Sequence, residues 1–154
     1  MEEEIIEFPG LMSRPAEPED EEVIFQLNRA LIDRYESVET IPYKKVLDWV
    51  RREIRNHLGE YRALFWQGEK TGYYRFHQEG AEMELSDLYI LPKWQGKGMG
   101  TAVLAHCIAQ TNLPISLYVF IRNTGAFRLY TRMGFSIYQQ AGTRYRMRRE
   151  ASTV

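Results

Sequence analysis

The chain has 154 residues, of which 44% are hydrophobic and 27% are charged, and its formal net charge is -1. This length and composition are typical of one soluble domain that buries enough apolar surface to fold without disulfides or a structural metal. The near-zero net charge provides no overall attraction to nucleic acid or to an anionic membrane, so neither is expected as a partner.

The first half of the chain predicts a leader, a strand and two helices. Residues 1–10 are acidic and end in Pro-Gly, and we expect them to form a loose leader before a short strand at 11–14. Apolar residues then recur at three- and four-residue steps, which predicts helices at about 18–35 and 43–58.

The second half predicts mostly strands, because aromatic and β-branched runs alternate with turn residues. The expected elements are, in order, strands 61–67, 71–77 and 82–91, helix 99–111, strand 115–121, helix 124–133, and strands 135–140 and 143–149. The whole of 1–154 is expected to form a single mixed α/β domain.

A single cysteine and the absence of apolar runs bear on the cellular location. Cys107 is the only cysteine, which excludes an internal disulfide and a cysteine zinc site. The N-terminus lacks the basic and apolar regions of a signal peptide, and no apolar run reaches the roughly 20 residues of a membrane span. We therefore expect a protein of the reducing cytoplasm.

A glycine-rich turn lies between strand 82–91 and helix 99–111. Gly96, Gly98 and Gly100 leave room for a ligand to approach the backbone, and the unpaired N–H groups at the helix start would face an anion such as phosphate. The spacing matches neither the P-loop nor the dinucleotide-binding pattern.

The segment Leu88-Tyr-Ile-Leu-Pro-Lys-Trp-Gln-Gly-Lys-Gly-Met-Gly-Thr resembles the central motif of the GNAT acyltransferase superfamily, whose turn reads Gln/Arg-x-x-Gly-x-Gly/Ala. A second stretch, Asn123-x-x-Ala126-x-x-Leu129-Tyr130-x-x-x-Gly134-Phe135, resembles another motif of that family. The resemblance implies a GNAT-like fold, with a largely antiparallel mixed sheet of about seven strands flanked by about four helices. It also implies transfer of the acetyl group of acetyl-CoA to an amine of a small molecule or a protein.

The resemblance further implies where acetyl-CoA is held. In the family, the pyrophosphate lies on the amides of the glycine turn and the pantetheine arm follows the preceding strand. The corresponding residues here are Leu88, Tyr89, Ile90, Gln95, Gly96, Lys97, Gly98, Met99, Gly100, Thr101, Asn123, Ala126 and Tyr130.

Acyl transfer needs a base, because an alkylamine with a pKa of about 10 is mostly protonated at neutral pH. Glu84 has the offset from Ile90 at which some family members carry a catalytic glutamate, and Asp87 is the nearest competitor. Strand alternation puts the two acids on opposite faces, a bulge would exchange their faces, and either acid can be a solvated strand position. We favour Glu84. Tyr130 has the position of a family phenol that protonates the departing thiolate, or it is a core tyrosine.

The three histidines, His57, His77 and His106, show no carboxylate partner at metal-ligand spacing, so no metal is expected. Cys107 falls on the apolar side of its helix, which favours direct transfer in a ternary complex over an acyl-cysteine.

The sequence does not identify the acceptor amine. The early helices and strands carry many aromatic residues, which either line an acceptor site or fill the core. A non-catalytic acyl-CoA sensor on the same fold is the alternative function, although Tyr130 argues against it, and a phosphate-binding domain for another nucleotide is a third. The resemblance allows a homodimer that involves the last two strands.

Overall fold

The computed structural model describes residues 2–151, which form eight strands and four α-helices. The strands are β1 (Glu4–Ile5), β2 (Leu11–Pro15), β3 (Tyr61–Trp66), β4 (Glu69–Glu79), β5 (Glu82–Ile90), β6 (Ile115–Phe120), β7 (Ser136–Ala141) and β8 (Arg144–Arg149). The helices are α1 (Asp20–Tyr35), α2 (Tyr43–Asn56), α3 (Met99–Ala109) and α4 (Thr124–Arg132). The predicted mixed α/β fold is confirmed. No helix within 2–151 is both long and apolar enough to cross a bilayer.

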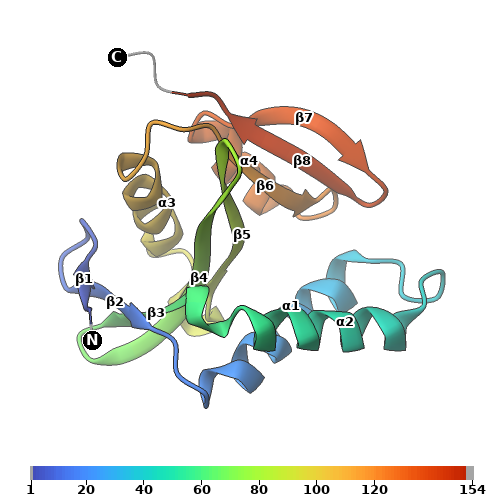
Figure 1. Ribbon diagram of the computed structural model, residues 1–154, viewed down its shortest axis with the longest axis horizontal. Helices are drawn as coiled ribbons and strands as arrows, with labels where there is room; N and C mark the ends of the chain where they lie inside the picture. Colours follow the sequence, from blue (N-terminus) through green and yellow to red (C-terminus); the bar gives the residue numbers. More distant parts are fainter. Residues whose placement is uncertain (1, 152–154) are drawn as a thin grey trace.

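All eight strands belong to one sheet, in the order β1-β2-β3-β4-β5-β6-β8-β7. Every neighbouring pair is antiparallel except β5 and β6, which run parallel. A parallel pair needs a crossover connection, and the glycine turn with α3 supplies it here (Figure 1).

The expected loose leader at 1–10 is wrong for the part of it that the structure describes. β1 pairs with β2, Ile6 is fully buried, and Phe8 packs against the same core cluster. The acidic residues around these two apolar side chains made the segment resemble an unstructured leader. With β1 included, the sheet has eight strands rather than the predicted seven.

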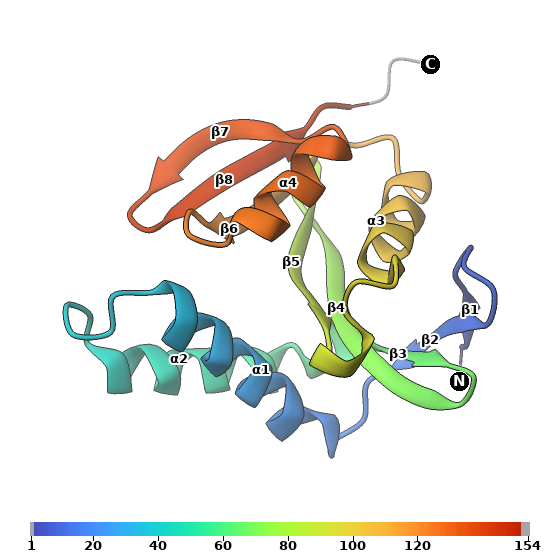
Figure 2. The same cartoon turned by 180° about the vertical axis from the view of Figure 1, so that it is seen from behind.

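Two hydrophobic clusters cover opposite faces of the sheet. One joins α3 and α4 to Leu85, Leu117 and Val119, and the other joins α1 and α2 to Tyr73 and Tyr89. Figures 1 and 2 show α1 and α2 side by side, apart from α3 and α4.

A bulge in β5 decides which way its acids point. Arg75 pairs with Asp87 and Phe76 pairs with Leu85, so Ser86 is an extra residue. Because Glu84 pairs with His77, two residues along β4 from Arg75, both acids face the α1–α2 side of the sheet. Simple alternation, which places Glu84 and Asp87 on opposite faces, is wrong here.

β5 and β6 pair only at their starts. The register contains Met83 with Ile115 and Glu84 with Ser116, and no later pair within the described chain. Beyond Glu84 the two strands diverge, and the second half of β5 is left without a partner on that side. This opening is the route between the two faces.

Candidate active site

A cavity of about 1420 Å³ extends from the glycine turn, past the unpaired half of β5, to the face covered by α1 and α2. On the α3–α4 side it is lined by Leu88, Ile90, Gln95, Gly96, Gly98, Met99, Gly100, Thr101, Asn123, Ala126 and Tyr130. On the α1–α2 side it is lined by, among others, Leu27, Asn28, Leu31, Arg34, Tyr35, Trp49, Tyr61, His77, Glu84, Asp87, Tyr118 and Arg144. One cavity thus includes all the sequence-predicted site residues except Lys97, which is exposed outside it.

The glycine turn has the geometry that its glycines allow. Gly96 and Gly98 have φ values of 76° and 87°, in the left-handed region that other residues rarely adopt, and Gly98 is the N-cap of α3. The Gln95 side chain donates a hydrogen bond of 2.9 Å to the carbonyl of Ile90. Gln95 therefore ties the turn to the end of β5.

Gly100 is a glycine for a different reason. It lies in the first turn of α3 without a positive φ, and a Cβ added there would only make ordinary contacts with Leu129 at 3.7 Å and Ile90 at 3.9 Å. Neither backbone strain nor packing requires a glycine at this position. The space beside it belongs to the cavity, so a larger side chain would take room from a bound ligand.

Asn123 and Tyr130 place α4 against the same cavity. Asn123 caps the helix, because its Oδ1 accepts a hydrogen bond of 3.3 Å from the N–H of Ala126. Its amide nitrogen makes no hydrogen bond within residues 2–151, and the residue lines the cavity. The ring of Tyr130 packs edge-on against Phe135 at 5.9 Å. Burial, with a smaller effect of the Asp87 charge, raises the pKa of Tyr130 to about 12, so this phenol keeps its proton near neutral pH.

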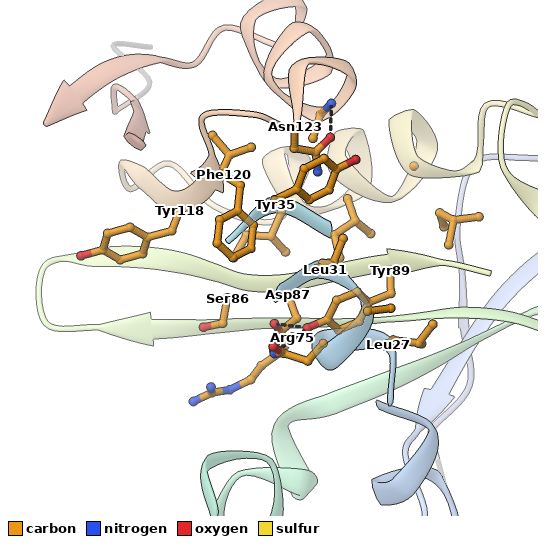
Figure 3. Close-up of a pocket in the computed structure, with 18 of the residues that line it drawn as sticks. Leu27, Leu31, Tyr35, Arg75, Ser86, Asp87, Tyr89, Tyr118, Phe120 and Asn123 are labelled. Atoms are coloured by element: carbon orange, nitrogen blue, oxygen red, sulfur yellow. Dashed lines mark hydrogen bonds between the residues drawn. The ribbon is translucent and has the colours of Figure 1, made fainter. Parts of the chain in front are cut away.

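Asp87 is the centre of a polar network at the opening between β5 and β6 (Figure 3). Its Oδ2 accepts a hydrogen bond from the hydroxyl of Tyr61, and its Oδ1 accepts one of 2.7 Å from Tyr89. Asn28 of α1 donates to the Tyr89 oxygen at 2.9 Å. Burial, together with the charge of Asp87, raises the pKa of both Tyr61 and Tyr89 well above the ordinary value, so both phenols remain donors to the carboxylate.

Glu84 has different neighbours, although it faces the same way. One of its carboxylate oxygens lies 3.6 Å from His77 Nε2, where β5 still pairs with β6. The same His77 nitrogen lies 2.6 Å from the hydroxyl of Ser86, and its Nδ1 lies 3.1 Å from Glu79. His77 therefore has two carboxylate neighbours, so the expectation that no histidine has a carboxylate partner at metal-ligand spacing is wrong for His77.

His77, Glu79 and Glu84 bring potential ligand atoms within 4.8 Å of one another. Both ring nitrogens of His77 already face protein groups, so the contacts described above account for this cluster without a cation. The absence of a metal stays a prediction.

The remaining predicted residues fall as follows. Leu88, Tyr89 and Ile90 belong to the half of β5 that has no partner in β6. Cys107 is fully buried in α3, where burial and the charge of Glu4 raise the pKa of its thiol to about 12. A thiolate, the nucleophilic form, is therefore disfavoured at Cys107.

Sequence reasoning missed Tyr61 and Asn28. Tyr61 of β3 lies 26 residues before Asp87, to which it donates directly. Asn28 of α1 lies 61 residues before Tyr89, through which it reaches Asp87. No local motif marks such contacts, because only the pairing of distant strands creates them.

Comparisons with known proteins agree with this architecture. A family model described as the acetyltransferase (GNAT) family matches residues 24–135. No curated protein matches the sequence.

Solved structures similar to this chain include the PaiA N-acetyltransferase from Thermoplasma acidophilum in complex with coenzyme A. It is 18% identical with a TM-score of 0.68, and the match covers 91% of this chain and 98% of that one. An acetyltransferase from Thermus thermophilus is 20% identical, with a TM-score of 0.68 and coverage of 94% and 99%. A chimera of the spermidine N-acetyltransferase SpeG from Vibrio cholerae and hSSAT is 21% identical, with a TM-score of 0.62 and coverage of 92% and 95%. At these identities the likeness concerns the fold.

Proposed function

The chain belongs to the acetyltransferase (GNAT) family, and we propose that it transfers the acetyl group of acetyl-CoA directly to an amine in a ternary complex. One observation carries the proposal. The opening between β5 and β6 joins the glycine turn, Tyr130 and Asp87 in one cavity that reaches both faces of the sheet. Donor and acceptor can therefore enter from opposite faces and meet in the opening.

The cavity fits acetyl-CoA on its α3–α4 side. The N–H groups that follow Gly98 at the start of α3 would hold the pyrophosphate, and the glycine at position 100 leaves space for it. The edge of β5 from Leu88 to Ile90 that has no strand partner in β6 and the Asn123 amide would bind the pantetheine arm. The coenzyme A in the PaiA structure supports this assignment. When bound, acetyl-CoA supplies the activated acetyl group.

We assign the proton transfers to Asp87 and Tyr130. A carboxylate has about four lone-pair sites, so two bonds from Tyr61 and Tyr89 leave Asp87 able to accept a proton from the acceptor amine. The hydroxyl of Tyr130 would protonate the departing thiolate. Its pKa of about 12 exceeds the ordinary thiol pKa of about 8.5, so this proton transfer is uphill by itself and has to be coupled to the favourable conversion of the thioester to an amide, after which the phenolate regains a proton from solvent. Asp87, rather than Glu84, is proposed as the base because it lies beyond the end of the β5–β6 pairing.

The acceptor is an amine that enters from the α1–α2 side. Leu27, Leu31 and Tyr35 of α1 line this side opposite Phe120 and Tyr118 of β6 (Figure 3). A cytoplasmic location and a homodimer belong to the same proposal. A non-catalytic acyl-CoA sensor would require the glycine turn but neither Asp87 nor Tyr130. Because both residues line the same cavity as the turn, we favour the enzyme over the sensor.

Calorimetric titration with acetyl-CoA, combined with a thiol-release assay on a panel of amines, tests the proposal. Gly100→Leu should abolish binding, because its side chain occupies the cavity without imposing backbone strain. Gly59→Leu is the matched control, since Gly59 also lacks a positive φ, has nothing within 4 Å of an added Cβ, and lies outside the cavity. Binding without thiol release from any amine would favour the sensor, and no binding by the wild type would refute both functions.

A further inference from the structure

The acceptor side of the cavity separates charges of opposite sign. Asp87 and Glu84 lie on its β5 wall, where Arg75, the cross-strand partner of Asp87, has its charge matched by Glu60 at 2.8 Å. Arg144 of β8 and Arg34 of α1 also line the cavity, and β6 separates β8 from β5. An amine held at Asp87 would therefore extend toward two guanidinium groups.

Arg144 differs from the arginines that follow it on β8. Arg146 and Arg148 both reach Glu82, at 3.1 Å and 3.6 Å. The Arg144 side chain makes no ion pair or hydrogen bond with any residue from 2 to 151, and its guanidinium lies 4.6 Å from the centre of the Tyr118 ring. Stacking of this kind fixes a guanidinium while leaving its N–H donors free.

The Tyr118 ring is itself held in place. Arg146 donates a hydrogen bond of 3.1 Å to its hydroxyl, and Tyr118 pairs with Arg146 across the two strands. Tyr118 is 38% exposed and lines the cavity. Arg146 therefore supports the surface on which Arg144 rests, while its own charge is matched by Glu82.

Arg34 adds a second unpaired guanidinium on the α1 side. It makes no ion pair with the described residues and lies 5.2 Å from the Tyr35 ring. Tyr35 stacks on Phe120 at 6.0 Å, and Phe120 is the cross-strand partner of Arg144. This contact joins the end of α1 to the strands that carry Arg144.

Acids also occur at this end of the cavity. Glu36 accepts a hydrogen bond of 2.9 Å from the Thr143 hydroxyl, and Glu53 lies 3.8 Å from His57. Glu36 is the C-cap of α1, so its hydrogen bond with Thr143 connects the end of this helix to the residue that precedes Arg144. Its carboxylate makes no contact within 4 Å with either Arg34 or Arg144, so their donors remain open to a ligand.

From this arrangement we infer that the acceptor carries an anionic group, a carboxylate, at a distance from its amine, and that Arg144, assisted by Arg34, binds it. The inference rests on the proposed function, because it names the class of acceptor for the same site. The apolar side chains between the two poles, among them Leu31 and Phe120, suit a hydrocarbon body. Arg144 is a specificity-determining residue in this scheme and takes no part in proton transfer.

The test measures acetyl transfer by the wild-type protein to a series of ω-amino carboxylates of increasing chain length and to the carboxamide of each one. At the chain length that spans the cavity, the carboxylate should have a kcat/KM about tenfold above that of its carboxamide, as a charge-assisted bidentate contact provides. Arg144→Gln should remove this preference by raising KM for the carboxylates far more than for the carboxamides. Arg52→Gln on α2, an exposed arginine outside the cavity, should leave the preference intact.

The outcomes separate the inference from the function on which it rests. Two results would overturn the inference without affecting the proposed function. One is equal or faster transfer to the carboxamides at every chain length, and the other is an equal loss of kcat/KM on both series in Arg144→Gln. If acetyl-CoA binds but neither series nor any other amine accepts the acetyl group, the proposed function fails and the inference fails with it. Thermal denaturation of each variant shows whether the fold is retained.

Discussion

Replacing Asp87 with Asn tests the assignment of the base, and the structure gives the size of the effect. Asp87 accepts hydrogen bonds at both oxygens, from Tyr61 and Tyr89. A carboxamide accepts at only one atom and turns N–H groups toward the other phenol, so one bond is lost and a buried hydroxyl is left without an acceptor. This loss should cost about 1–3 kcal/mol of stability. Removal of the base should lower kcat at least about 100-fold, which corresponds to about 2.7 kcal/mol in the barrier.

Glu84→Gln is the matched comparison. Its side chain is 23% exposed beside His77, outside the opening between the strands, so kcat should change by less than about threefold because no proton transfer depends on it. Initial rates of thiol release at saturating acetyl-CoA, measured across neutral and alkaline pH, compare the two variants, and thermal denaturation monitors folding. Retained activity in Asp87→Asn with loss in Glu84→Gln would refute the assignment. If the rate of thiol release by Asp87→Asn recovered at low temperature, the defect of this variant would lie in folding rather than in proton transfer.

Three further results are expected. Tyr130→Phe should lower kcat about 100-fold with little change in acetyl-CoA affinity by calorimetry, and an unchanged kcat would place Tyr130 in the core only. Because burial and the Asp87 charge raise the pKa of Tyr61 and Tyr89, their contribution to stability is complete below the ordinary tyrosine pKa of 10.0 and is lost as pH rises above it. Denaturant unfolding at several alkaline pH values should show this decline, and a flat profile would contradict it. Although burial opposes ionisation, the N–H of Glu17 and the side chain of Lys70 lower the pKa of Asp20, so Asp20→Asn should destabilise the protein by about 2 kcal/mol at neutral pH. The difference from wild type should disappear as pH falls below 3.8, and a constant difference would be inconsistent with ionisation of Asp20.

Local pattern was sufficient where the chemistry is local. The turn at Gly96 and Gly98 needs positive φ values, and only glycine adopts them without strain, so the turn and the start of α3 could be read from the chain. The helices and most strands follow from apolar periodicity in the same way. Asn123, which caps α4 through the N–H of Ala126, lies within the second motif for a similar reason.

The N-terminal segment shows where pattern failed. Its acids predicted a loose leader, whereas Ile6 is buried and β1 pairs with β2. Short segments of this kind gain their order from a neighbouring strand and from a core formed by distant residues, and neither is visible in the segment itself.

The amino-acid sequence thus determined the order of elements, the family and the glycine turn, since each depends on residues close together along the chain. Only the tertiary structure decided the direction of Asp87, because it depends on the extra residue Ser86 opposite β4. The same holds for the hydrogen bonds from Tyr61 and Tyr89 and for the position of Arg144 across the cavity. These features arise when strands far apart in the sequence pair, or fail to pair, and no spacing along the chain encodes the opening between β5 and β6.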